Sequence, residues 1–217
     1  MLRSASSLAV LLVLGLALTG CQRAYFNALE RIGIEKRDVL VDRVEEARDS
    51  QNEAQEQFRD ALEEFSALVD FDGGDLEQMY ESLNREYERS EDRADDVRDR
   101  LDAVHTVATA LFDEWEDELD AYEDRDLRRQ SERQLRQTRA RYEDMLAAME
   151  RAERKMAPVL EAFQDQVLFL KHNLNARAIA SLEGTVAELE TDVDELIRDM
   201  EASIAEANAF IEQMQAG

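Results

Sequence analysis

Apolar residues recur at alternating steps of three and four along most of this chain, and no other feature of the sequence constrains the fold so strongly. This spacing is the period of an α-helix with one apolar stripe, and its heptad-like form suits knobs-into-holes packing between helices. Four stripes run over residues 40–68, 76–115, 127–163 and 182–211. A single proline and seven glycines leave little to interrupt them, so each stripe predicts one long helix.

Turn-forming residues separate the stripes at few places. Residues 71–75 hold two adjacent glycines and mark a firm turn, after which Asp75 is suited to cap the next helix. Residues 122–126 predict a second turn, which is weaker because it lacks glycine and proline. Pro158 lies inside the third stripe and predicts a kink there.

Matching lengths predict how these helices are arranged. Helices over residues 23–69, 75–121 and 126–172 would each have about 47 residues and a length of roughly 70 Å. Asn173 and Asn175 then favour a hinge before the last helix. The alternative is one very long final helix that runs straight through both asparagines. The predicted fold class is all-α, an elongated antiparallel up-down bundle or coiled coil of long helices.

The distribution of charged residues supports a hairpin at the second turn, residues 122–126. Eight acids without a base end the second segment, and seven arginines with two acids begin the third. Folding the chain back at the second turn brings Glu116 near Arg133 and Asp113 near Arg136, which favours this register over others. The alternative is that the arginine run binds an anion or a lipopolysaccharide phosphate, and we favour the intramolecular interpretation.

The first twenty residues have the pattern of an export signal. Arg3 gives a positive start without acids, and residues 8–18 form an apolar run that is short for a permanent membrane-spanning helix. The run ends in Leu18-Thr19-Gly20-Cys21, which resembles the bacterial lipobox. In that signal the cysteine thiol accepts a diacylglycerol, and a peptidase cuts before it, after a small residue such as glycine. The resemblance implies that Cys21, the only cysteine, is lipidated; an uncleaved anchor is the alternative.

This interpretation divides the chain into three parts. Residues 1–20 are a lipoprotein signal peptide, residues 21–35 a lipidated juxtamembrane segment, and residues 36–217 a single elongated helical-bundle domain. Acyl chains on Cys21 would hold the protein at a membrane. The residue after the cysteine is Gln22 and not Asp. By resemblance to Gram-negative lipoproteins, the lack of Asp at this position favours sorting to the outer membrane, with the protein facing the periplasm.

The net charge of −25 restricts the partners. Such a surface repels nucleic acid and anionic lipid headgroups, and it attracts cations, polyamines or a basic protein. We therefore expect no nucleic-acid partner. The expected contacts are the membrane, through the lipid on Cys21, and either a second copy of the chain or another envelope protein.

Few residues suit catalysis or metal binding. His105 and His172 are the only histidines, and neither belongs to a Glu-x-x-His or His-x-x-x-His pair. Four acids surround the first turn, but their spacing does not match an EF-hand loop, so a capped polar turn is favoured over a calcium site. These acids are Asp70, Asp72, Asp75 and Glu77. We predict no catalytic residue, no metal and no cofactor.

Residues 163–182 are unusually apolar for this chain. Phe169 and Leu170 are expected to continue the stripe, while Leu168 and Leu174 widen it. The simple interpretation is that this is the most buried part of the bundle. The functional one is a contact surface for a partner, placed at the end far from Cys21. Its candidate contact residues are Phe169, Lys171, His172, Asn173 and Asn175.

Five segments carry a resemblance to a known family, residues 36–44, 65–68, 71–76, 111–115 and 167–176. They resemble a family of uncharacterised bacterial lipoproteins, domain of unknown function 2959, over nearly all of the chain after the signal. The resemblance implies a secreted, coiled-coil-rich lipoprotein and no particular activity. The leading hypothesis is a non-enzymatic scaffold or interaction protein of the cell envelope. The alternatives are an acidic module that binds cations or polyamines and, less favoured, an envelope enzyme.

Overall fold

The computed structural model describes residues 35–69, 76–173 and 183–216. Four long α-helices and one short 3-10 helix make up nearly all of these ranges. The helices, in chain order, are α2 (Lys36–Val69), α3 (Leu76–Glu118), η1 (Leu119–Ala121), α4 (Arg125–His172) and α6 (Glu183–Ala216).

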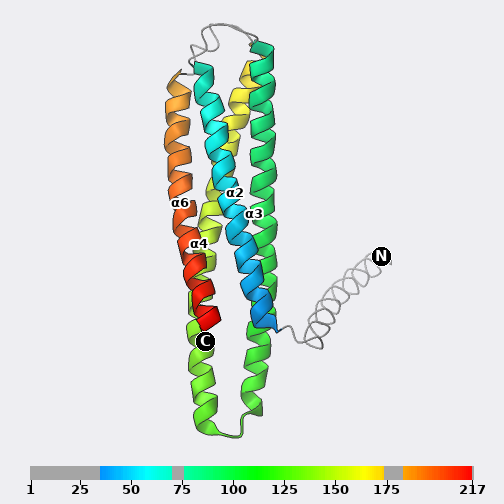
Figure 1. Cartoon of the computed structure of the whole chain (residues 1–217), viewed down its shortest axis with the longest axis vertical. Helices are drawn as coiled ribbons and strands as arrows, with labels where there is room; N and C mark the ends of the chain where they lie inside the picture. The colour runs from blue at the N-terminus through cyan, green and yellow to red at the C-terminus, as the bar shows by residue number, and fades with distance from the viewer. Residues whose placement is uncertain (1–34, 70–75, 174–182, 217) are drawn as a thin grey trace, which may run out of the picture.

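The four long helices run alternately up and down and pack side by side (Figure 1). α2 packs against α3 and α6, and α4 packs against the same two helices, so the four surround a common core. α4 has 48 residues, and at 1.5 Å per residue it is about 72 Å long. The structure confirms the predicted all-α, elongated antiparallel up-down bundle.

The ends of α4 lie close to where the sequence predicted them. Asp124 caps the start, because its Oδ1 accepts hydrogen bonds from the backbone N–H of Asp126 at 2.7 Å and of Leu127 at 3.1 Å. At the other end the helix stops at His172, and Asn173 has left helical geometry. A helix running unbroken through Asn173 is therefore wrong. The helix does continue past Pro158. The glycine turn at residues 71–75 lies outside the described residues.

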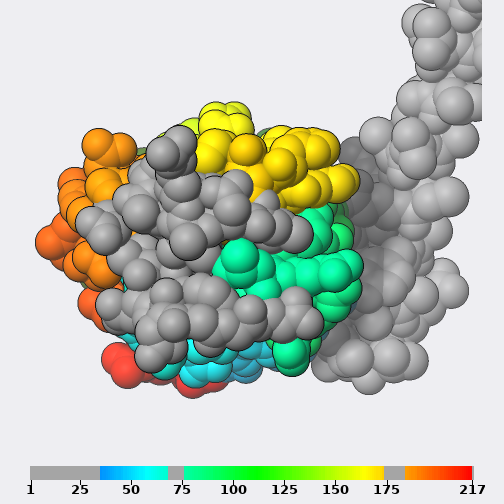
Figure 2. All heavy atoms as spheres, turned by 90° about the horizontal axis from the view of Figure 1, so that it is seen from above, coloured from blue at the N-terminus to red at the C-terminus, as the bar shows by residue number. Residues whose placement is uncertain are grey.

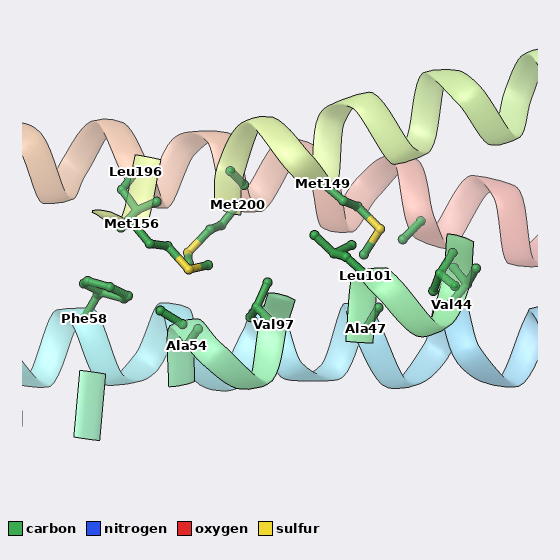
Figure 3. Close-up of a cluster of buried hydrophobic side chains, with 14 of the residues drawn as sticks. Val44, Ala47, Ala54, Phe58, Val97, Leu101, Met149, Met156, Leu196 and Met200 are labelled. Atoms are coloured by element: carbon green, nitrogen blue, oxygen red, sulfur yellow. The ribbon is translucent and has the colours of Figure 1, made fainter. Parts of the chain in front are cut away.

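The core combines large side chains from some helices with small ones from others. Figure 3 shows Met149 and Met156 of α4 reaching between the helices toward Ala47 and Ala54 of α2. Higher in the bundle, Phe163 stacks on Phe65 with ring centroids 4.8 Å apart. Large and small residues that alternate across facing helices fill the interior without voids.

The four helices are not of equal length, which corrects the prediction of matching segments. α2 and α6 have 34 residues each, whereas α3 has 43 and α4 has 48. The start of α2 lies beside Glu114 of α3, because Lys36 Nζ donates to Glu114 Oε1 at 2.8 Å. The α3–α4 hairpin therefore extends beyond the other two helices (Figure 1). We call residues 115–134 the hairpin extension and the four-helix part the body. Residues 23–34, which the sequence assigned to the first helix, lie outside the described residues.

The ion pairs across this hairpin differ from the predicted ones. Glu116 pairs with Arg139 at 2.7 Å, rather than with Arg133. The cause is the lean of helical side chains toward the N-terminus of their own helix. In an antiparallel pair the two side chains lean in opposite directions, so partners meet although their Cα atoms are offset. Nearer the turn, Asp120 pairs with Arg128 at 2.9 Å.

Candidate functional site

Cys21, the predicted lipidation site, lies outside the described residues. Within the described ranges, none of the helices has both the length and the apolar character needed to cross a bilayer.

The upper end of α4 exposes two large apolar side chains. Leu168 is 49% exposed and Phe169 is 39% exposed, whereas their neighbours Val167 and Leu170 are buried. The expectation that Phe169 continues the stripe is therefore wrong, as is the expectation that all of this stretch is buried. The buried stripe steps from Phe163 to Val167 and then to Leu170, which turns Leu168 and Phe169 outward. Figure 2 looks onto this end, with the last turns of α4 in yellow beside the start of α3 in green.

The other predicted contact residues divide into exposed and structural ones. Lys171 and His172 are exposed beside the apolar pair. Asn173 has a structural role, because its backbone N–H donates to the Leu170 carbonyl at 3.0 Å and its side-chain Nδ2 donates to the Phe169 carbonyl at 2.9 Å. These bonds satisfy carbonyls that the end of a helix leaves free. Asn175 lies outside the described residues.

Three arginines of the run in α4 contact acids of the same chain. Arg128 contacts both Asp120 and Glu132, and Arg129 contacts Asp126. Arg139 pairs with Glu116 and also lies 5.0 Å from the centre of the Phe112 ring. This agrees with the intramolecular interpretation of the run at these three arginines.

The junction of body and extension holds a cavity that the sequence did not predict. It has a volume of about 920 Å³ and opens to solvent where α2 begins and α6 ends. Lys36, which is only 8% exposed, lines it from α2, and Trp115 lines it from α3. The Trp115 ring is held in place because its Nε1 donates to Ser131 Oγ of α4 at 2.8 Å. The space exists because α2 and α6 are shorter than α3 and α4. The spacing of apolar residues does not show where a helix ends, so the sequence did not predict the cavity.

A buried polar cluster in the body was also not singled out from the sequence. Ser203 Oγ of α6 donates to Gln51 Oε1 of α2 at 2.6 Å, and Gln51 Nε2 donates to the Met149 carbonyl of α4 at 3.2 Å. Gln51 and Ser203 are fully buried. The signal was available, because Gln51 occupies a stripe position where every neighbour in the stripe is apolar. Buried polar groups that are fully hydrogen-bonded can fix the register of a bundle.

Four groups have raised pKa values: two buried tyrosines, and Arg98 and Lys155, whose pKa values are raised by hydrogen bonds to Glu153 and Asp199. Burial, with smaller contributions from Glu150 and Glu143, raises the pKa of Tyr142 to about 12. Burial also raises the pKa of Tyr87, whose hydroxyl accepts a hydrogen bond from Gln164 Nε2 at 2.9 Å. His105 Nδ1 lies 3.4 Å from the Tyr142 hydroxyl. Among the described residues, no three His, Cys, Asp or Glu side chains gather as they would around a metal ion.

The fold and these surfaces define an all-α protein, a bundle of four long antiparallel helices with one protruding hairpin. The chain matches a family described as a protein of unknown function (DUF2959) over residues 25–214, and it belongs to that family. The matched region begins before the first residue of α2 and ends within α6. No curated protein matches the chain.

Proposed function

We propose that this protein is a lipid-anchored, non-enzymatic scaffold of a bacterial cell envelope. Lipid on Cys21 attaches it to the outer membrane from the periplasmic side, and the far end of the bundle contacts another envelope component. The observation that carries the proposal is the difference between the two ends of a long bundle. α2 begins near one end, and the exposed Leu168 and Phe169 lie at the opposite end of α4.

The dimensions of the bundle support a spacer. α2, which follows the anchor segment, rises 34 residues, or about 51 Å, toward the end that carries the apolar pair. The body between the ends is covered by charged side chains, many in ion pairs, and this keeps its surface soluble. An apolar pair beside Lys171 and His172 is a patch of the kind that marks a small protein contact, with one or two apolar residues at its centre.

Attachment is tested at the cysteine. We expect mass spectrometry of the protein purified from cell envelopes to find residue 21 as the amino terminus and to find it acylated. A Cys21→Ala variant is expected to carry no acyl chain, to keep residues 1–20 uncleaved and to remain folded by circular dichroism. An unmodified Cys21 in the envelope-purified protein would reject the anchor while leaving the bundle untouched.

Contact at the far end is tested with two matched leucines. Leu168 and Leu127 are similarly exposed and lie near opposite ends of α4, so Leu168→Asp and Leu127→Asp place the same change at the two ends. A photo-crosslinking residue at 169, in intact cells, is expected to give a discrete adduct that Leu168→Asp abolishes and Leu127→Asp preserves. The same residue at the exposed position 151, in mid-bundle, is the control and is expected to give no such adduct. Equal adducts from positions 151 and 169 would argue against a specific contact.

A further inference from the structure

The lining of the cavity at the junction differs in charge from the chain as a whole. The chain carries a net charge of −25, whereas the acids and bases that line the cavity balance each other. They are Glu35, Glu114 and Glu118 on one side of the balance, and Lys36, Arg37 and Arg133 on the other. Lys36 and Glu114 pair with each other at 2.8 Å. The lining therefore has no net charge that would select a cation or an anion, which favours a neutral ligand.

Amide side chains supply most of the remaining polar lining. Gln130, Gln134 and Gln137 follow each other at steps of four and three along α4, so they form a row on one face of that helix. Gln213 lines the same cavity from α6. An amide both donates and accepts hydrogen bonds without carrying a charge. Four amides around one space therefore suit a ligand that is rich in donors and acceptors, as a saccharide is.

One of these amides has an unsatisfied acceptor. Gln213 Oε1 is buried, and no donor in the part of the chain that the structure describes bonds to it. A buried acceptor without a donor is unfavourable, and a bound molecule that brings an N–H or O–H group removes this cost. The acceptor on α6 therefore indicates that the ligand carries a donor at this side of the cavity.

The cavity also has a small apolar part. Trp115 and Leu111 line it from α3, and Met214 lines it from α6. The hydrogen bond from Trp115 Nε1 to Ser131 Oγ holds the indole ring in place before any ligand binds. A fixed indole offers a surface on which the C–H face of a sugar ring can pack. Leu111 and Met214 suit a methyl group, such as that of an acetamido substituent.

We propose that this cavity binds a neutral, N-acetylated oligosaccharide. Sugar hydroxyls bond to the amide row of α4, an acetamido N–H donates to Gln213 Oε1, and a sugar ring packs against Trp115. The volume of about 920 Å³ lies within the range of about 300–1,000 Å³ that is usual for small-ligand sites. The proposal goes beyond the proposed scaffold role and does not depend on it, because every residue used here lies at the junction and none lies at Cys21 or at the far end of α4.

Charged ligands fit this lining less well than a neutral saccharide does. A polyamine would place ammonium groups near Arg37 and Arg133, and a polyanion would place its charges near Glu35 and Glu118. Like charges repel each other, so either ligand loses at one part of the lining what it gains at another. The acidity of the whole chain attracts cations, but this cavity adds nothing to that attraction.

The only tryptophan of the chain lines the cavity and reports its occupancy. The probe is triacetylchitotriose, a neutral N-acetylated trisaccharide, added to the full chain in a detergent without a sugar headgroup. We expect a saturable shift of Trp115 emission to shorter wavelength, because the bound sugar displaces water from the indole. Isothermal titration calorimetry with the same probe gives the dissociation constant independently of the fluorescence.

Two glutamines of α6 form a matched pair for locating the site. Gln213→Leu removes the buried acceptor at similar side-chain size and is expected to weaken binding about 5–10-fold. Gln215 is exposed on the same helix and does not line the cavity, so Gln215→Leu is expected to bind as the parent does. Trp115→Leu is expected to weaken binding at least about tenfold in calorimetry. Circular dichroism checks folding, and Gln213→Leu still tests the site if Trp115→Leu loosens the extension.

Three outcomes would overturn the proposal. The first is the absence of saturable binding of triacetylchitotriose in both measurements. The second is binding that Gln213→Leu and Gln215→Leu leave equal, which would place the sugar elsewhere on the chain. The third is saturation of the Trp115 signal by spermidine in place of the trisaccharide, which would assign the cavity to a cation. A chain that binds the trisaccharide but carries no lipid on Cys21 would reject the anchor alone, so the two ideas fail separately.

Discussion

The body and the hairpin extension follow the same helical period, yet they bury it to very different degrees. Leu135 lies in the body and is 5% exposed, whereas Leu127, two turns earlier in the same stripe of α4, is 54% exposed. The two leucines differ in their neighbours. Leu135 belongs to the buried core cluster, whereas Leu127 lies in the extension, where α3, η1 and α4 run on without α2 and α6. An apolar stripe therefore favours burial, but how much of it is buried depends on how many helices pack around it. The stripe is buried in the body and only partly buried in the extension.

Different interactions stabilise the body and the extension. The body is held by large buried side chains such as Phe58, Phe65 and Phe163. Ser131 is the only buried residue of the extension. The extension is held together by the hydrogen bond from Trp115 to Ser131 and by ion pairs near the turn. Apolar burial contributes more than exposed ion pairs do, at about 1.5–3 kcal/mol per large side chain against about 0–1 kcal/mol per pair. The extension is thus expected to be the less stable part.

The largest expected effect is a truncation in the body. Phe163→Ala removes a fully buried ring that stacks on Phe65 and Phe58, and it should lower the free energy of unfolding by about 3–5 kcal/mol. Leu127→Ala in the extension is the matched change and should cost less than about 0.5 kcal/mol, because the side chain is already half in solvent. Urea unfolding followed by circular dichroism measures both. Similar losses in the two variants would remove the distinction between body and extension.

The fold was predictable because a long helical period leaves few alternatives. The sequence predicted α4 over residues 126–172 and the structure has Arg125–His172, because Asp124 is a good cap and Asn173 a good stop. The step between body and extension was not predictable in the same way. Periodicity says which side of a helix faces inward, and it does not say how many other helices reach that level.

The candidate site shows a second limit. Residues 167–170 are all apolar, so the sequence there offers two continuations of the stripe, and the predicted one through Phe169 was wrong. Tertiary packing selects Val167 and Leu170 and leaves Leu168 and Phe169 outside. The position of Gln51 in an apolar stripe indicated that it is buried, but its partner Ser203 was hidden, since the two residues are 152 positions apart. Local patterns do not specify such long-range pairs.

A second test of the body uses pH. The folded-state pKa of Tyr142 is raised to about 12, so the buried neutral phenol stabilises the fold fully below the unfolded pKa of about 10. This contribution is lost as the pH rises from about 10 to about 12, and it amounts to about 2–3 kcal/mol. Tyr142→Phe should flatten the fall in stability over that window, measured by urea unfolding at several pH values. An equally steep fall in Tyr142→Phe would assign the alkaline sensitivity to other groups, such as Tyr87.

A third test asks whether the polar cluster of the body contributes by packing or by hydrogen bonding. Gln51→Ala leaves a void and should cost about 2 kcal/mol. Gln51→Leu keeps the volume, and Ser203 Oγ retains the Met200 carbonyl at 2.9 Å as an acceptor, so the change should stay within about 1 kcal/mol. Thermal unfolding of both variants measures the difference. A loss in Gln51→Leu as large as that in Gln51→Ala would show that the hydrogen bonds themselves stabilise the bundle.

The last test concerns the hydrogen bond that holds the extension together. Ser131→Ala removes the acceptor of the Trp115 indole N–H and should cost about 1 kcal/mol. Because few buried side chains couple the extension to the body, this loss should appear as faster amide exchange in residues 115–134 and leave exchange in the body unchanged. Hydrogen exchange measured by mass spectrometry resolves the two regions. Faster exchange that spread equally to the helices around Phe163 would mean that the bundle opens as one cooperative unit, and the contrast between Leu127 and Leu135 would then describe exposure without describing stability.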